Sequence, residues 1–177
     1  MKSEKHKELL LEMIVSLSNI DSLDLNLGDS RYLLSNIIAK YTNCGKIFLS
    51  EKTKKLLEEA SIKTYGEVKY KSKFYGKKST YYKTHKVQFI VEHVVPCGVI
   101  LKLILESDKT KKTIEKILDC NKVVMLLKEE DLLLNQSGYS KKTTDDFEVY
   151  SNIWGRYSKS GISVSENYFI NTGTIFR

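Results

Sequence analysis

The centre of the chain reads Phe89-Ile90-Val91-Glu92-His93-Val94-Val95-Pro96. Its apolar residues predict a buried strand, and this strand ends in an acid and an imidazole. Burying two proton-accepting side chains costs free energy, and apolar packing gives no reason for placing them there. We therefore interpret the end of this strand, just before the only proline of the chain, as the edge of an active site.

The length and charge of the chain narrow the possible classes of protein. With 177 residues, the chain is long enough for one domain with a substantial apolar core. Its 29 Lys and Arg against 22 Asp and Glu give a net charge of +7, which favours a polyanionic partner but is also typical of an ordinary lysine-rich protein. Three widely spaced cysteines, Cys44, Cys97 and Cys120, indicate neither a disulfide framework nor a zinc site.

The sequence predicts neither a secretory leader nor a membrane span. The N-terminal apolar stretch is interrupted by Glu12 and lacks a small-residue cleavage site. No run approaches the roughly 20 apolar residues that cross a bilayer. We expect a cytoplasmic protein that does not contact the membrane.

Residues 1–60 are predicted to be helical. Apolar residues at helical spacing predict one helix that ends before Asn19, a second from about Ser30 to residues 43–45, and a short third helix over 51–60 that Ser50 caps.

The composition changes sharply in residues 61–88. Eight lysines and six aromatic residues stand there against one acid, Glu67. We predict a basic aromatic hairpin whose lysines neutralise phosphates while its aromatic rings stack on bases. The lysines chosen as nucleic-acid contacts are Lys71, Lys73, Lys77 and Lys78. The alternative is a mobile hairpin whose lysines only keep the protein soluble.

Residues 98–135 complete the central part of the chain. The apolar residues 98–106 predict a buried helix or strand, and Ser107 or Asp108 is predicted to cap the next helix. Asn121 then opens a second strand over residues 122–127, which a helix over residues 128–135 follows directly. The predicted order is strand, connection, strand, helix.

This order and two short motifs resemble the HNH, or ββα-metal, nucleases. The motif Val91-Glu92-His93-Val94-Val95-Pro96 is similar to the Asp/Glu-His-Ile/Val-Val-Pro signature of several HNH branches, and Asn121-Lys122-Val123-Val124 stands where the second strand of the family begins. The resemblance covers residues 89–135. It implies a metal-dependent endonuclease acting on DNA, with RNA not excluded, in host defence, restriction or a mobile element.

Phosphodiester hydrolysis gives two of these residues a chemical role. It needs a base, and His93 can accept a proton at neutral pH. It also needs a divalent cation such as Mg²⁺ or Mn²⁺, to which Glu92 and His93 are the first candidate ligands. Neighbours on a regular strand point to opposite faces, so the strand must bend or end here for both to reach one site.

The resemblance adds two further roles. It implies a third metal ligand on the helix after the second strand, for which Asp131 is the first choice, ahead of Asn135 and Glu130. Asn121 would orient the loop or the histidine and belongs to the predicted catalytic set. The chain departs from the family because no histidine follows His93.

The C-terminal part, residues 136–177, offers one more candidate. Arg156 could contact a phosphate through its fork of donors. Alternatively, Trp154 and Tyr157 pack on the core while Arg156 caps a helix. Residues 164–176 could add a final strand.

We therefore predict a single domain of the α+β class. Its parts are a helical N-terminal part (1–60), a basic aromatic hairpin (61–88), an HNH-like core (89–135) and a C-terminal extension (136–177). A homodimer is possible. The alternatives to a nuclease are a catalytically inactive nucleic-acid-binding regulator or phage-encoded inhibitor on the same fold, and a dimeric structural scaffold.

Overall fold

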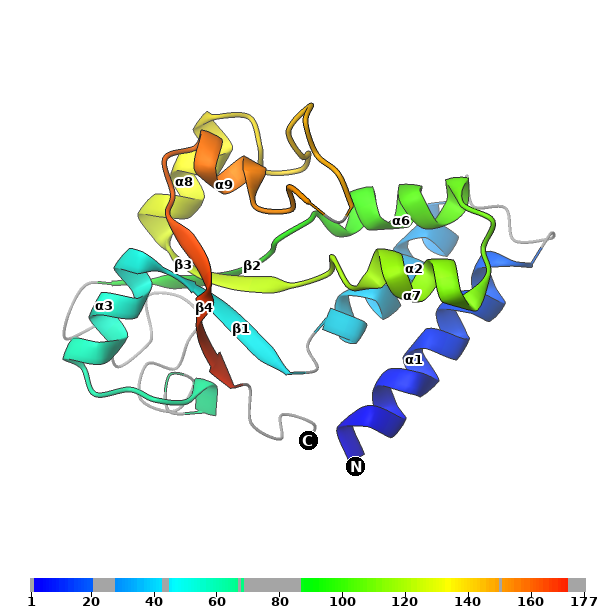
Figure 1. The fold of residues 1–177 in the computed structure, drawn as a ribbon, viewed down its shortest axis with the longest axis horizontal. Helices are drawn as coiled ribbons and strands as arrows, with labels where there is room; N and C mark the ends of the chain where they lie inside the picture. Colours follow the sequence, from blue (N-terminus) through cyan, green and yellow to red (C-terminus); the bar gives the residue numbers. More distant parts are fainter. Residues whose placement is uncertain are drawn as a thin grey trace.

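The computed structural model describes residues 2–20, 28–42, 45–66, 68, 87–149 and 151–171, and shows a mixed α+β fold (Figure 1). The α+β class predicted from the sequence is thereby confirmed. The four lysines of the predicted basic hairpin lie outside the described residues.

The strands of the described structure form one mixed sheet with the order β2-β3-β1-β4. β1 runs parallel to β3 and antiparallel to β4, while β2 runs antiparallel to β3. The strands predicted to begin near residues 89, 122 and 164 are confirmed. The bounds are β1 (Lys46–Ser50), β2 (Phe89–His93), β3 (Val123–Leu127) and β4 (Val164–Asn171).

The prediction that residues 1–60 are helical is wrong at β1, which lies between the second and third predicted helices. The run Ile47 to Leu49 is apolar and buried, but it is too short for a helix between Gly45 and the helix cap at Ser50. β1 lies inside the sheet between β3 and β4, and both of its faces are covered, because Phe48 belongs to one apolar cluster while Ile47 and Leu49 belong to the other. A short, fully buried strand has no period-2 pattern, which is why the sequence did not reveal it.

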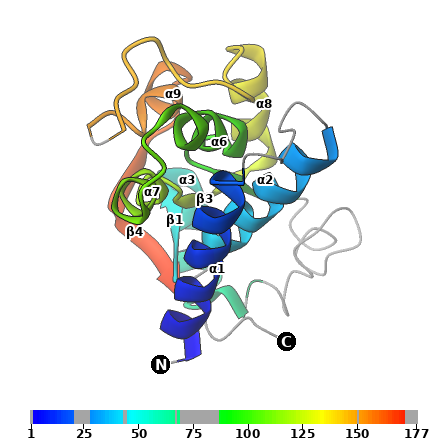
Figure 2. The same ribbon diagram turned by 90° about the vertical axis from the view of Figure 1, so that its right-hand side faces the viewer.

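Four of the helices form one group beside the sheet. α1, α2, α6 and α7 pack against one another beside the sheet, as Figures 1 and 2 show. No helix of the described residues has both the length and the apolar composition to cross a membrane. The bounds are α1 (Lys2–Ser18), α2 (Gly28–Thr42), α3 (Glu51–Glu59), α6 (Cys97–Glu106), α7 (Lys111–Leu118), α8 (Lys128–Gln136) and α9 (Gly155–Lys159).

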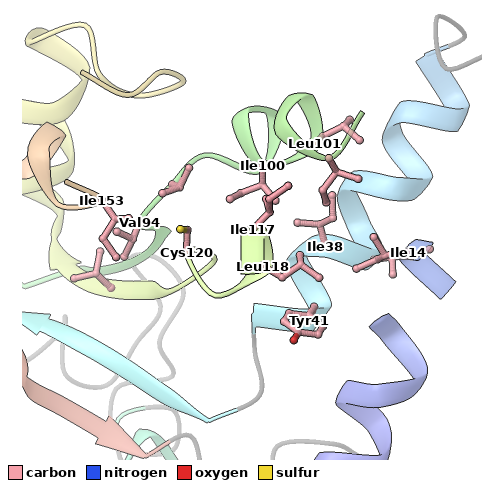
Figure 3. Packing of buried hydrophobic residues seen from close by; sticks show 14 of the residues in the cluster. Ile14, Ile38, Tyr41, Val94, Ile100, Leu101, Ile117, Leu118, Cys120 and Ile153 are labelled. Carbon is pink, nitrogen blue, oxygen red and sulfur yellow. The ribbon is translucent and has the colours of Figure 1, made fainter. Parts of the chain in front are cut away.

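Alternate residues of β3 serve two apolar clusters. Val124 and Leu126 belong to the larger cluster, which includes Ile38 of α2 and Ile100 of α6 (Figure 3). Val123, Met125 and Leu127 belong to the smaller cluster, which also holds Leu57 of α3. β3 is therefore covered on both faces, and its C-terminal end delivers the chain directly into α8.

The start of α7 differs from the prediction. Thr110, rather than Ser107 or Asp108, is its N-cap, and its hydroxyl accepts a hydrogen bond from the backbone N–H of Thr113. Ser107 instead ends α6 and donates its hydroxyl to the carbonyl of Ile104. Lys109 between them has a positive φ of 54°, which separates the two helices.

Candidate functional site

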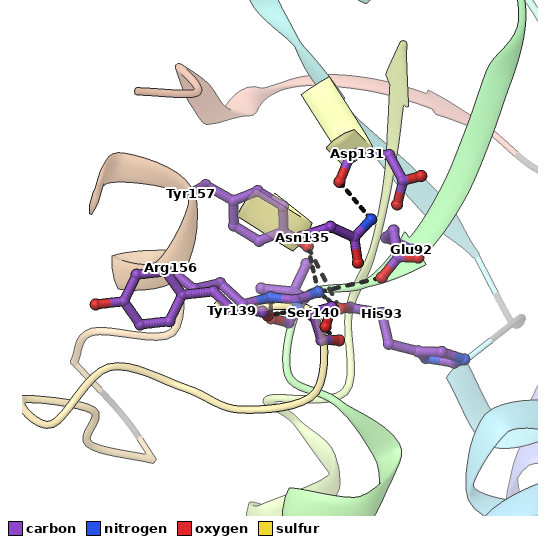
Figure 4. Close-up of polar contacts among 9 residues, drawn as sticks. Glu92, His93, Asp131, Asn135, Tyr139, Ser140, Arg156 and Tyr157 are labelled. Carbon is purple, nitrogen blue, oxygen red and sulfur yellow. Dashed lines mark hydrogen bonds and ion pairs between the residues drawn. The ribbon is translucent and has the colours of Figure 1, made fainter. Parts of the chain in front are cut away.

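Glu92 and His93 lie on opposite faces of β2. The β2–β3 register is regular to its end, where Glu92 pairs with Val124 and His93 with Val123. Successive side chains of a regular strand point to opposite faces, so the bend needed to bring both into one site is not found. In Figure 4 the Glu92 carboxylate faces Asp131 and Arg156, while the imidazole of His93 points away from them.

The Glu92 carboxylate is largely withdrawn from water, with 30% of its side chain exposed. Its Oε2 atom lies 3.4 Å from Nη2 of Arg156. Burial raises the pKa of Glu92 above its usual value, and the negative charge of Asp131 raises it further, while Arg156 and Lys128 act in the opposite direction. Two carboxylates from different elements therefore converge, and we call Glu92 and Asp131 the carboxylate pair.

Asp131 reaches this position because α8 begins immediately after β3. Its carboxylate pairs with the ammonium group of Lys128, one turn earlier on the same helix. One turn later, Asn135 donates its side-chain N–H to the Asp131 carbonyl at 2.8 Å. The side chain of Lys128 is 45% exposed, so its ammonium group can move without disturbing the core.

Glu130, the third choice for this metal ligand, forms structural hydrogen bonds instead. Its Oε2 atom accepts hydrogen bonds from the Ser50 hydroxyl at 2.6 Å and from the backbone N–H of Leu127 at 2.9 Å. The side chain thus joins the start of α8 to the start of α3, where Ser50 is the N-cap. Glu130 is buried and committed to these contacts, so it does not face the carboxylate pair.

Arg156 is the organising cation of the site. Only 2% of the residue is exposed, so it does not stand on the surface where a phosphate contact was predicted. Its Nε donates to the carbonyl of Val94 at 3.0 Å and its Nη1 to the carbonyl of Tyr139 at 2.7 Å. Its Nη2 donates to the carbonyl of His93 and to the hydroxyl of the buried Tyr157. The guanidinium therefore joins the end of β2 to the loop after α8, as Figure 4 shows.

The loop after α8 also packs closely on the start of α9. A Cβ atom on Gly155 would stand 2.7 Å from the hydroxyl of the buried Thr144, so only glycine fits there without displacement. This close approach helps to place Arg156, the next residue, beneath the loop.

His93 and Asn121 form a separate polar contact on the other face of β2. Within the described structure, His93 Nδ1 and Asn121 Oδ1 are both buried and make no hydrogen bond of regular geometry. Burial lowers the pKa of His93 below its usual value, and the Asn121 side chain acts in the opposite direction. The two side chains are thus close enough to interact, although not as a well-formed hydrogen bond. Asn121 also donates to the carbonyl of Ile38 at 2.8 Å, which fastens α2 to the start of β3.

The donor set fits a cation of the magnesium type, but without the histidine. No group of three or more His, Cys, Asp or Glu side chains comes together in the described part of the chain. Mg²⁺ needs fewer, because it is usually held by one or two carboxylates together with water and substrate phosphate oxygens. The carboxylate pair satisfies that requirement, with the Asn135 amide one turn along α8.

The sequence did not single out Lys128 or Tyr157 as parts of this site. Lys128 had a usable signal, since it stands three residues before Asp131 on a predicted helix and residues at that spacing are neighbours. Tyr157 had none, because its hydroxyl is buried against the carbonyl of His93, which is distant in sequence. Comparisons with protein-family models, curated proteins and solved structures find no match for this chain.

Proposed function

We propose that this chain is a divalent-cation-dependent endonuclease that hydrolyses phosphodiester bonds in DNA, with the cation held by the carboxylate pair. The observation that carries the proposal is the convergence of Glu92 from β2 and Asp131 from α8. Burial raises the pKa of Glu92, and the negative charge of Asp131 adds to that rise, so the place where the two carboxylates meet favours a cation.

The residues of the site divide the chemical work. Glu92 and Asp131 would hold Mg²⁺ or Mn²⁺, and the cation would supply charge stabilisation at the phosphate. The raised pKa of Glu92 makes its carboxylate a stronger proton acceptor than an ordinary glutamate when no cation is bound to it. Arg156 holds the Glu92 carboxylate in place, and Lys128 would be available to a substrate phosphate if a cation took its place at Asp131.

The order β2, α6–α7, β3, α8 supports the ββα resemblance, since β2 and β3 are antiparallel and α8 carries an acid of the site. The position of His93 speaks against a histidine base, so the proposal departs from the HNH mechanism at that point. Nucleic acid is the proposed substrate because the chain has a net charge of +7 and eight lysines in residues 63–86.

The second candidate is a nucleic-acid-binding regulator without catalysis. The observation that favours it is that Lys128 and Arg156 already neutralise the carboxylate pair from within the protein. A protein that only binds nucleic acid would keep these internal ion pairs permanently.

Cleavage of supercoiled plasmid and of RNA, with Mg²⁺, Mn²⁺ or a chelator, tests the proposal. We expect cleavage only with the cation, and a loss of about 100-fold or more in Glu92→Gln and Asp131→Asn. His93→Gln is the matched control on the same strand and should cleave within a few-fold of the wild type. Cleavage in chelator, or loss in His93→Gln equal to that in Glu92→Gln, would contradict the proposed site. A wild type that binds DNA without cutting it would establish the second candidate.

A further inference from the structure

We infer that the loop after α8, residues 137–143, is a phosphate-contacting surface through which Lys141 and Lys142 bind the backbone of a nucleic acid, and that Arg156 is the residue that positions it. We call these residues the lysine loop. The inference rests on the proposed function, because it assigns the surface that presents the substrate to the carboxylate pair.

The lysine loop has a defined backbone. α8 ends where Gly138 adopts a positive φ of 76°, and the N–H of Tyr139 donates to the carbonyl of Leu134 at 2.9 Å. This is a common glycine-based helix end, and it turns the chain sharply away from the helix axis. The loop therefore starts at a fixed direction from the helix that carries Asp131.

Arg156 then fixes the loop relative to the carboxylate pair. Its Nη1 donates to the Tyr139 carbonyl at 2.7 Å and lies 3.4 Å from the Ser140 carbonyl. The same guanidinium lies 3.4 Å from the Glu92 carboxylate through Nη2. A single planar group thus spans the loop backbone and one member of the pair, so the two cannot move apart independently (Figure 4).

The two lysines that follow are free to meet an external anion. Lys141 and Lys142 are exposed, and neither forms an ion pair with any residue that the structure describes. Lys142 Nζ lies 5.8 Å from the centroid of the Tyr139 ring, which keeps the side chain on the loop. By contrast, Lys159 on the neighbouring α9 pairs with Asp146 at 2.8 Å. Asp145 and Asp146 are the nearest acids along the chain, and Asp146 is already occupied.

The charges of the lysine loop favour the phosphodiester backbone of a nucleic acid as the partner. Two exposed ammonium groups without an ion-pair partner among the described residues suit successive phosphates, and Arg156 links the backbone of their loop to Glu92. An acidic polypeptide would meet the same lysines, but its own carboxylates would gain no specific contact with the pair. The test must therefore distinguish the binding of an acidic polypeptide from the binding of a nucleic acid.

The test compares Lys141→Ala/Lys142→Ala with Lys112→Ala/Lys116→Ala. The control lysines are also exposed, they lie on α7 on the far side of the molecule from α8, and their loss changes the net charge equally (Figure 1). Fluorescence anisotropy with labelled DNA and RNA in chelator measures binding without cleavage. We expect the loop variant to bind about tenfold more weakly at low salt, with its slope of log K against log salt reduced by about 2 for duplex DNA. The control variant should retain the wild-type slope.

Each of several results would overturn the inference. The two double variants could weaken DNA binding equally, or the loop variant could keep the wild-type slope of log K against log salt. Polyglutamate could also displace the labelled DNA as effectively as unlabelled DNA of the same charge does. A wild type that binds neither DNA nor RNA would also overturn it. If the wild type binds through the loop but never cleaves, the proposed hydrolysis fails while the loop assignment stands. If cleavage persists in a loop variant that binds normally, the loop assignment alone fails.

Discussion

Glu92 and His93 are neighbours whose charged forms are both disfavoured by burial, with opposite effects on the pH dependence of stability. The pKa of Glu92 is raised above 4.5, so the folded protein holds a proton there more readily than the unfolded chain does. The free energy of unfolding therefore decreases as the pH rises through the pKa of Glu92 in the folded protein. The pKa of His93 is lowered below 6.5, so the unfolded chain binds more protons, and stability is lost as pH falls below 6.5.

Neutral variants separate these two effects. At pH 7, Glu92→Gln should raise the free energy of unfolding by about 0.5–2 kcal/mol, because it removes a carboxylate that is costly to charge and keeps an acceptor for Arg156. The free energy of unfolding of His93→Gln should depend on pH as that of the wild type does above pH 6.5. Below pH 6.5 it should decrease less than that of the wild type. Urea denaturation between pH 4 and 8 measures both. A Glu92→Gln protein that is less stable than the wild type at pH 7 would show that Glu92 is structural.

The sequence predicted one site for Glu92, His93 and Asp131, whereas the structure brings Glu92 toward Asp131 and leaves His93 on the other face of β2. The two-residue period of a strand separates Glu92 from His93, and the structure follows that period without a bend. Arg156 could not have been placed, because arginine is rarely buried and its acceptors are carbonyl groups distant in sequence.

At the scale of elements, the site depends on how α8 is joined to the sheet. Ser50 caps α3, and its hydroxyl also donates to Glu130. Glu130 in turn accepts a hydrogen bond from the backbone N–H of Leu127, where β3 passes into α8. We expect Ser50→Ala to lower the free energy of unfolding by about 2 kcal/mol, since it removes a cap and a donor to a buried carboxylate.

Thr110→Ala is the matched control for this prediction. Thr110 caps α7 in the same manner, but its contacts are exposed and involve no buried charge. Its loss should cost about 0.5–1 kcal/mol. Chemical denaturation measures both variants, and equal losses would mean that the Ser50–Glu130 hydrogen bond contributes nothing beyond the cap.

Most helices and three of the strands could be predicted because each has its own local pattern. The cap at Ser50 and the strand at Val123–Leu127 are examples, since their signals lie within a few residues. β1 could not be recognised, because its apolar residues are buried on both faces and owe their strand conformation to β3 and β4. The parallel pairing of β1 with β3 joins segments more than 70 residues apart and leaves no local trace.

At the scale of the whole molecule, one buried arginine connects the parts that the sequence keeps separate. Arg156 comes from the C-terminal part, yet it holds the end of β2, the carboxylate pair and the lysine loop together. The candidate site therefore draws on residues from both the predicted HNH-like core and the predicted C-terminal extension.

Binding of Mn²⁺ to the protein without nucleic acid, measured by electron paramagnetic resonance, tests the carboxylate pair most directly. The wild type and His93→Gln should bind one ion with similar affinity, and Glu92→Gln and Asp131→Asn should bind it at least tenfold more weakly. The affinity of the wild type should also fall with decreasing pH, because protons compete for Glu92, whose pKa is raised. Equal binding by all four proteins, or loss of binding in His93→Gln alone, would contradict the account.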